Sequence, residues 1–408
     1  MPKAMIVSVG GTIQPIIKSI CEHKPEFVSF FSSQDSADMV AQIKAEVANN
    51  GLRTKSEITL TDDVNDLLHC YTKAEETVGR VISKGYLKED VIVDYTGGTK
   101  NMSVALALAA ITHGFSFSYV GGKERTKNGI GVVINGHEEI YPSINPWDFL
   151  AIEEKKKIAL LFNQYQFKAA KNLVDGLLGK STKYKSLFKK VGFLIDGYHK
   201  WDLFRHSEAL ELFKRAKIDE LLEVDDKSIR EFTKVTESKL SFLEEIIKVG
   251  RKASVLFILD MYANAERRFN EGKVDDAILR LYRLVEMVAQ ERLFRNYGVD
   301  VSDVKMEVIP DKFKIEFINQ YRNLRDGRIK IPQSAAFKLL GILDDDLGKI
   351  FKANESKFLN IQTSRNHSYL AHGFESSKEK TYLTLKEFVL ELDTFKVSDV
   401  PVFPAMEI

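Results

Sequence analysis

Two patterns of hydrophobic residues divide the chain near residue 145. Before it, short continuous apolar runs alternate with stretches in which apolar residues recur every three or four positions, as expected for strands followed by helices. The runs predict strands over 4–9, 27–32, 56–60, 91–96 and 115–120. The recurring spacings predict helices over 12–23, 36–49, 64–83 and 103–112. Such repeated β-α-β units indicate a parallel sheet covered by helices on both faces.

A hairpin is predicted next, because Asn135 and Gly136 stand between the apolar segments 131–134 and 138–141. After Pro146 the strand signals stop, and helical spacing continues to about residue 390. The fold class is therefore α/β plus all-α: a Rossmann-like parallel-sheet domain followed by a helical connector and a helical domain. We place these three parts at 1–145, 146–250 and 251–408.

The net charge, the number of cysteines and the lengths of the apolar runs disfavour several classes of protein. The 408 residues carry a formal net charge of +1, which disfavours stable binding to DNA but leaves room for a local basic groove. Cys21 and Cys70 are too few for a disulfide scaffold and are expected to be free thiols in a reducing cytoplasm. The apolar run 4–9 is too short for a signal peptide or a membrane span, so we expect a cytoplasmic protein without membrane contact.

Three of the predicted strands end in residues suited to binding a ligand. In an open parallel sheet, ligands bind beyond the carboxyl ends of the strands, where the strand order reverses. The candidate ligand-binding residues are Gly10, Gly11, Thr12 and Gln14 after the first strand, Ser32, Ser33 and Gln34 after the second, and Thr96, Gly97, Gly98, Thr99, Lys100 and Asn101 after the fourth.

The segment DYTGGTKNMS (94–103) is the most informative of the three. Its two glycines let backbone amides approach a ligand, and the helix N-terminus that follows favours anions. Lys100 adds positive charge, and the neighbouring threonines and Asn101 add neutral hydrogen-bonding groups, which suits a phosphodiester with attached bases. Either glycine pair alone could simply make a tight strand-to-helix turn. The phosphate motifs GxxxxGK[ST] and GxGxxG are absent, which disfavours a nucleotide triphosphatase or a dinucleotide enzyme.

A second constellation lies in SRNHSYLAHGF (364–374). Arg365 and His372 are seven residues apart, which on a helix is two turns and places both on one face, roughly 10 Å apart along the axis. Histidine suits removal of a ribose 2′-hydroxyl proton and arginine suits stabilisation of the phosphate, so the pair, with Asn366, predicts metal-free RNA cleavage. A symmetric dimer would complete a site for which one chain supplies too little. Such a pair is also common on solvated helix faces, and His367 is expected to be exposed without a role, RNA contact being the alternative.

Both constellations together resemble the CARF–HEPN ribonucleases of type III CRISPR defence, in particular the Cas02710-like branch. VGGTIQPII (9–17) and DYTGGTKNMSVALALAA (94–110) are similar to the two signature strand ends of CARF domains. SRNHSYLAHGF is similar to the HEPN motif, and the helices that begin near Ala265 resemble those that precede this motif in the branch. The resemblance covers both ends of the chain and is less diagnostic over about 150–250.

The resemblance implies a concrete function in antiviral defence. The CARF domain would bind a cyclic oligoadenylate, a tetra- or hexa-adenylate, across the two-fold axis of a homodimer as an allosteric activator. Arg365, Asn366 and His372 of both chains would form one composite catalytic site in the HEPN domain. That site would cleave single-stranded RNA without a metal ion or other cofactor and leave a 2′,3′-cyclic phosphate.

Three alternatives stay open. A sensing module that regulates transcription through DNA would need a one-sidedly basic helix, and none is clear in the C-terminal part of the sequence. A metal-dependent nuclease would need clustered carboxylates, for instance at Pro310-Asp311, on a small sheet that the pattern does not predict. The CARF pocket could also cleave its own ligand slowly, with help from Thr12, Thr99 and Lys100.

Overall fold

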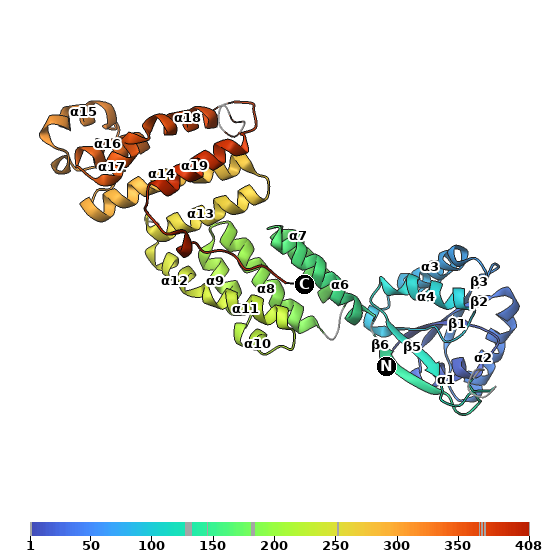
Figure 1. Ribbon diagram of the computed structural model, residues 1–408. Helices are drawn as coiled ribbons and strands as arrows, with labels where there is room; N and C mark the ends of the chain where they lie inside the picture. Colours follow the sequence, from blue (N-terminus) through green and yellow to red (C-terminus); the bar gives the residue numbers. More distant parts are fainter. Residues whose placement is uncertain are drawn as a thin grey trace. The chain divides into compact units, whose positions relative to one another are not determined.

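The computed structural model describes residues 2–126, 133–144, 146–180, 184–250, 253–366, 368, 370 and 373–407 (Figure 1). The described chain forms two compact units. The N-terminal unit comprises Met1–Lys156 and Asn172–Lys189, and the helical unit comprises Lys157–Lys171 and Lys190–Ile408. Among the described residues, no helix is both long and apolar enough to cross a membrane.

A six-stranded sheet forms the centre of the N-terminal unit, in the order β3-β2-β1-β4-β5-β6. Its strands are β1 (Ala4–Val9), β2 (Phe27–Ser33), β3 (Lys55–Thr61), β4 (Val91–Asp94), β5 (Ser116–Gly121) and β6 (Glu139–Ile144). The first five strands run parallel, and β6 pairs antiparallel with β5. The prediction of a parallel sheet in an N-terminal α/β domain is confirmed.

Two pairs of helices cover the two faces of this sheet, as Figure 1 shows. The helices are α1 (Gln14–His23), α2 (Ala37–Asn49), α3 (Leu67–Ser83) and α4 (Lys100–Ile111). Alternate residues of a strand point to opposite faces. In β1, Ala4 and Ile6 therefore pack with α3 and α4, while Met5 and Val7 pack with α1 and α2. Because the central strands are apolar on both faces, they appear in the sequence as continuous hydrophobic runs.

The sheet differs from the sequence prediction at two places. β4 ends at Asp94 instead of residue 96, because the Asp94 carboxylate accepts the backbone N–H of Thr96 at 2.9 Å and turns the chain out of the sheet. The strand predicted over 138–141 is β6, and it pairs with β5. Of its predicted hairpin partner, residues 131 and 132 lie outside the described residues, and Val133 bridges Arg125.

From Trp147 onward the described elements are helical, which confirms the prediction of an all-helical second part. The boundary between the two units falls within α6 (Trp147–Asn163), α7 (Phe167–Leu178) and α8 (Lys185–Asp202). The helices that follow are α9 (His206–Arg215), α10 (Ile218–Leu222), α11 (Lys227–Ser238), α12 (Leu240–Val249), α13 (Val255–Asn270), α14 (Val274–Tyr297), α15 (Asp311–Tyr321), α16 (Gln333–Ile342), α17 (Asp346–Ala353), α18 (Glu355–Asn366) and α19 (Glu379–Glu391).

The core of the helical unit is centred on α13 and α14, which pack on each other, while α14 also packs on α16 and α19. Ile278, Leu281, Val285 and Val288 form the apolar stripe of α14, and all four are buried. Their spacing of three and four residues is the pattern that predicted this helix. The segment that follows α19 packs on α8: the rings of Phe403 and Trp201 are in contact, with their centroids 5.2 Å apart.

A buried polar network joins α13 to α8 and α9. The Asp260 carboxylate accepts the indole N–H of Trp201 at 2.9 Å and lies 2.8 Å from Nε2 of His206. The Asp202 carboxylate accepts a hydrogen bond from Nε of Arg267 at 2.8 Å. All five side chains are buried. Because buried charges are costly unless they are paired, these contacts fix α13 against the helices before it.

Asp202→Ala is expected to destabilise the helical unit severely, because Arg267 would keep its buried charge without this carboxylate. Breaking a buried pair in this way costs about 3–5 kcal/mol. Urea unfolding of the variant beside the wild type, followed by circular dichroism, measures the loss. Asp219→Ala, at an exposed carboxylate of α10, is the control and should change the free energy of unfolding by less than about 1 kcal/mol. Equal effects of the two substitutions would contradict the role given to Asp202.

Candidate functional site

The two glycine pairs of the sequence meet where the strand order reverses. β2 and β3 lie on one side of β1 and the remaining strands on the other, so the carboxyl ends of β1 and β4 flank the switch point of the sheet. The loops after these strands touch backbone to backbone. A Cβ atom on Gly10 would lie 2.6 Å from the amide nitrogen of Gly98, and one on Gly97 would lie 2.4 Å from the carbonyl oxygen of Ser8. No side chain fits at either position without a shift of the backbone.

Gly11, unlike Gly10, has room for a side chain. A Cβ atom on Gly11 would meet nothing within 4 Å, and the residue is exposed. Thr12 and Gln14 are exposed as well, and Gln14 begins α1. The glycine pair thus does two things: Gly10 lets the two loops pack, and Gly11 leaves an open stretch of backbone at the start of a helix.

Hydrogen bonds fix the loop after β4 in place. The carbonyl oxygen of Gly97 accepts from the hydroxyls of Ser8 at 2.7 Å and Ser103 at 2.9 Å. The hydroxyl oxygen of Thr96 accepts the backbone N–H of Val120 at 2.8 Å, which ties the loop to the end of β5. Thr96 and Gly97 therefore hold the shape of the loop, and no sequence pattern pointed to Ser8 as part of its support.

Thr99 and Asn101 have structural partners at the start of α4. Thr99 caps this helix, since its hydroxyl oxygen accepts the backbone N–H of Met102 at 3.3 Å. The side-chain amide of Asn101 donates to the carbonyl oxygen of Asn65 at 2.8 Å and holds the segment after β3 against α4. Lys100, between them, is exposed and places a positive charge at the helix N-terminus.

The residues at the end of β2 are mostly buried. Ser32 and Ser33 are the last two residues of the strand, and both are buried. The hydroxyl of Ser32 donates to the carbonyl oxygen of Ser33 at 3.1 Å, and the hydroxyl oxygen of Ser33 accepts the backbone N–H of Ser36 at 3.2 Å. Gln34 is exposed. Of these predicted ligand residues, the structure leaves Gln34 open to solvent.

A buried carboxyl group, that of Asp94, holds elements of the candidate site in place. Asp94 at the end of β4 is fully buried, and burial raises its pKa although the hydroxyl of Ser19 and the backbone N–H of Thr96 donate hydrogen bonds to it. The contact with Ser19 joins α1 to β4. Asp94 therefore fixes the position of the first helix and of the second glycine loop, and it does so out of contact with solvent.

The helix that carries Arg365 is shorter than the sequence predicts. α18 ends at Asn366, and Ser368 and Leu370 are not helical, so the predicted single helix over 365–372 is not continuous. Arg365 stands in the last turn of α18, and its side chain lies outside what the structure describes. His367 and His372 lie outside the described residues, and Asn366 is exposed.

One carboxylate holds both sides of the loop that follows α18. Asp275, in the first turn of α14, is 6% exposed and accepts hydrogen bonds from the hydroxyl of Ser368 and, at 3.1 Å, from the backbone N–H of Ser377. Ser368 also forms an isolated parallel β-bridge with Glu375. These contacts draw the chain at Ser368 out of the helical path of α18, which is the physical reason why the helix ends at Asn366. No sequence pattern marks Asp275 as part of the site.

Comparisons with known proteins agree with this architecture. Residues 246–396 match the family model of the Csm6 HEPN domain, and residues 150–243 match that of the Csm6 6H domain. Together the two ranges cover more than half of the chain. A Rossmann-like domain with a candidate site at its switch point is thus followed by two helical regions of one family, and the chain belongs to the Csm6-like CARF–HEPN proteins.

Two solved structures resemble this chain, and only the first is similar enough to show the fold. Enterococcus italicus Csm6 bound to cyclic hexa-2′-fluoro-hexa-dAMP has a TM-score of 0.61 and 12% sequence identity, over 97% of this chain and 93% of that one. Can2 from Sulfobacillus thermosulfidooxidans in complex with cyclic tetra-adenylate has a TM-score of 0.26 and 12% identity, over 50% of this chain and 68% of that one. The first likeness shows a shared fold. None of the curated protein sequences is a recognisable relative.

Gly97→Ala is expected to destabilise the N-terminal unit by about 1–3 kcal/mol, the usual range for overpacking. The new Cβ atom would overlap the carbonyl oxygen of Ser8 and force the two loops apart. Gly11→Ala adds the same methyl group where nothing lies within 4 Å, and it should change stability by no more than about 0.5 kcal/mol. Thermal unfolding of both variants measures the difference, and equal melting temperatures would show that the loops do not pack as described.

Asp275→Ala is expected to lower the free energy of unfolding by about 1–3 kcal/mol at pH 7, because the donors of Ser368 and Ser377 lose a buried acceptor. Burial acts to raise the pKa of Asp275, but the hydrogen bonds from Ser368 and Ser377 outweigh it and lower the pKa. The stabilisation is therefore complete above the pKa of an unfolded aspartate, about 3.9, and is lost as the pH falls through the lower folded value.

Urea unfolding of the wild type and the Asp275 variant over a series of pH values checks this dependence. The difference between the two proteins should be constant near neutrality and should shrink below about pH 4. Asp276→Ala is the matched control, since its half-exposed carboxylate pairs with Arg280 at 3.0 Å and should contribute less than about 1 kcal/mol. A difference that does not change with pH would contradict the assignment to the ionised carboxylate.

Proposed function

We propose that this protein is a cyclic-oligoadenylate-activated endoribonuclease that cleaves single-stranded RNA without a metal ion in type III CRISPR defence. The observation that carries the proposal is the match of residues 246–396 to the Csm6 HEPN domain, because this range contains Arg365, Asn366 and His372. An arginine for the phosphate and a histidine for proton transfer are the side chains that such chemistry needs.

The proposed activator site is the switch point between β1 and β4. Gly11, Thr12, Gln14 and Lys100 are exposed there, at the starts of α1 and α4. Helix N-termini and a lysine attract the phosphates of a cyclic oligoadenylate, and the open backbone at Gly11 allows close approach. The ligand in the Enterococcus italicus structure, cyclic hexa-2′-fluoro-hexa-dAMP, supports a ring of this chemical class. We propose a tetra- or hexa-adenylate as the activator.

In the proposed reaction, His372 takes the proton from a ribose 2′-hydroxyl, and the oxygen attacks the adjacent phosphorus. Arg365 stabilises the negative charge on the five-coordinate phosphate, and Asn366 adds a neutral hydrogen bond. The bond to the 5′-oxygen breaks, this oxygen takes up a proton, and a 2′,3′-cyclic phosphate remains. We further propose that the activator site cleaves the ring slowly. Thr12 and Lys100 are exposed and open to the ring, whereas the Thr99 hydroxyl caps α4.

The proposal includes a homodimer, because one chain supplies a single set of catalytic side chains. Val104 and Leu108 stand one turn apart on α4, and each is 48% exposed, which supports the burial of this helix by a second copy. In this proposal, successive parts of the chain have different functions: residues 1–145 form a sensing domain, 146–250 a helical connector and 251–408 a ribonuclease domain.

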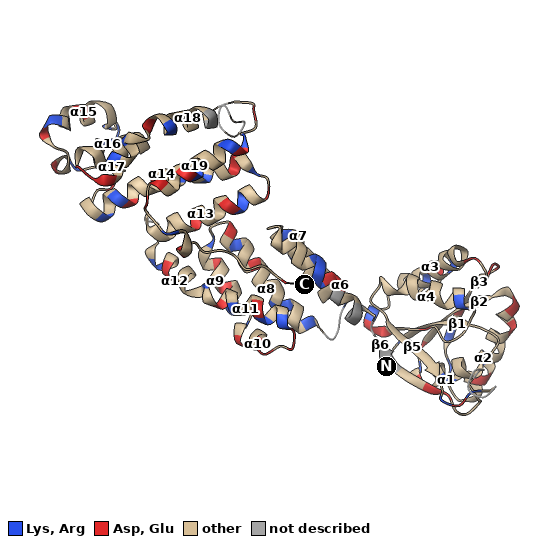
Figure 2. Ribbon diagram, in the orientation of Figure 1, with Lys and Arg blue, Asp and Glu red and all other residues tan. Residues whose placement is uncertain are grey.

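The two alternative functions of the helical part, a metal-dependent nuclease and a DNA-binding regulator, have less support. Asp311 begins α15, and its carboxylate pairs with Lys314 at 2.6 Å on a helix, whereas the metal-dependent nuclease would place such groups on a small sheet. Figure 2 shows Lys and Arg mixed with Asp and Glu along the described helices of the helical unit. A regulator that binds DNA would need a helix with basic residues gathered on one side.

Cleavage of a labelled single-stranded RNA in EDTA is expected only when a cyclic oligoadenylate is present. The tetra- and hexa-adenylate rings are added separately or withheld, and one of them should switch cutting on. Arg365→Ala and His372→Ala should each lower the rate roughly 100-fold or more, since they remove charge stabilisation and proton transfer. Both variants should still bind the ring, because their substitutions lie in the HEPN domain.

The outcomes separate the parts of the proposal. Ring binding without cutting under any condition would refute the ribonuclease and leave a sensing module that acts through binding. Cutting that appears with divalent cations and stops in EDTA would refute the metal-free chemistry. Cutting that persists in both variants would move the catalytic site away from Arg365 and His372.

A further inference from the structure

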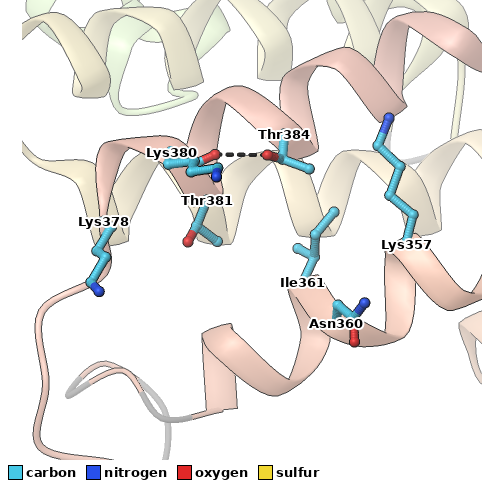
Figure 3. Close-up of a pocket in the computed structure, with 7 residues that line it drawn as sticks. All are labelled: Lys357, Asn360, Ile361, Lys378, Lys380, Thr381 and Thr384. Carbon is cyan, nitrogen blue, oxygen red and sulfur yellow. Dashed lines mark hydrogen bonds between the residues drawn. The ribbon is translucent and has the colours of Figure 1, made fainter.

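A groove with a volume of about 270 Å³ lies between α18 and α19 (Figure 3). It is lined from α18 by Lys357, Asn360 and Ile361, and from α19 and the residue before it by Lys378, Lys380, Thr381 and Thr384. The lining therefore combines three lysines with three neutral side chains that can form hydrogen bonds. None of the residues described as lining it is acidic.

The positive charge of the groove is concentrated at the start of α19. The ammonium group of Lys357 pairs with Glu391 at 3.0 Å. Lys378 and Lys380 are both exposed, and within the described part of the chain neither forms an ion pair with a carboxylate. Their charge is therefore available to an anion from solution, and a concave surface of one sign attracts such a ligand.

Both walls of the groove are continuous in sequence with the segment 365–372, which carries the proposed catalytic residues. Arg365 lies one helical turn beyond Ile361, about 6 Å further along α18. On the other wall, Lys378 directly follows Ser377, whose backbone N–H is held by Asp275. A strand with its scissile phosphate at Arg365 therefore has the groove within reach of its neighbouring nucleotides.

An exposed aromatic ring stands beside the same segment. Phe374, two residues after His372, is 98% exposed. It lies four residues before Lys378, so even a fully extended chain separates the two by no more than about 14 Å. Proteins that bind single-stranded nucleic acids combine these two features, since bases stack on exposed aromatic rings while a basic groove follows the phosphates.

We propose that this groove binds the phosphates of single-stranded RNA next to the cleaved bond, with Lys378 and Lys380 as phosphate contacts and Phe374 as a stacking residue. The inference rests on the proposed ribonuclease function and adds to it the way in which the substrate is held. Contacts of lysine to phosphate, and stacking on an aromatic ring, are tolerant of sequence. The groove therefore positions the strand without selecting a base.

Binding of an RNA that cannot be cut tests the groove separately from catalysis. A fluorescent single strand with a 2′-O-methyl group on every ribose lacks the attacking hydroxyl, and anisotropy gives its affinity for the full chain at several salt concentrations, with the ring present. Lys378→Gln combined with Lys380→Gln should weaken binding roughly tenfold. The slope of log K against log salt should fall by about 1.4, since each phosphate contact on a single strand contributes about 0.7.

Phe374→Ala should weaken binding while leaving the salt slope unchanged, because it removes no charge. Lys378→Arg combined with Lys380→Arg keeps both charges and should retain the wild-type slope. The matched control is Lys312→Gln combined with Lys396→Gln, which removes the same charge from exposed lysines outside the groove. With cleavable RNA, the groove double variant should raise KM and leave kcat within about twofold, as expected for loss of binding shared by substrate and transition state.

The outcomes distinguish the groove from the ribonuclease. A groove double variant with the same salt slope and KM as the wild type, while the wild type cuts RNA, would overturn the groove alone. A wild type that binds RNA through the groove but cuts none would overturn the ribonuclease alone. Failure of the wild type to bind the strand at low salt would overturn the groove. Loss of the dimer in Phe374→Ala, seen by size-exclusion chromatography, would assign this ring to an interface between copies.

Discussion

The arrangement of the helical unit depends on the buried carboxylate of Asp202. This residue ends α8 and forms ion pairs with Arg267 and Arg268 of α13. A buried charge that loses its partner costs several kcal/mol, so α13 cannot move away from α8 while the fold persists. Asp260 fixes the same two helices through the indole of Trp201. Most of the helices matched to the Csm6 6H domain thus share one compact unit with those matched to the HEPN domain, so they do more than separate the ends of the chain.

A short series of packed elements leads from the contact between α8 and α13 to the segment that carries the proposed catalytic residues. α13 and α14 pack on each other, and Asp275 in the first turn of α14 holds Ser368 and Ser377 on either side of the motif loop. Spatial continuity by itself is not coupling, which requires an element with two arrangements that both sites bias. On the proposed activation, Asp275 would be a point where such coupling acts, because its release would free both Ser368 and Ser377 at once.

How much of this the sequence predicts depends on the range of each interaction. The parallel sheet and the helical second part follow local periodicity, and their prediction is confirmed, although β4 is shorter than predicted and the strand at 138–141 pairs with β5. The end of α18 was not predicted, because it depends on Asp275, which lies 93 residues before Ser368 and carries no local signal. The burial of Ser32 follows from the position of β2 between β1 and β3, and strand order is a tertiary property that no single segment encodes.

The near-zero net charge and the lysine groove together define how RNA would be held. With a total of +1, and with screening over a Debye length of about 8–10 Å, attraction at a distance is weak and depends on where the few unbalanced lysines lie. Two phosphate contacts give modest, salt-sensitive affinity, which allows a nuclease to release its products, whereas an extended basic surface would retain them. Because Lys378 directly follows Ser377, the Asp275 carboxylate holds both the start of the proposed phosphate-binding groove and the loop that carries the proposed catalytic residues. On the proposed function, a change at Asp275 would therefore alter RNA binding and catalysis together.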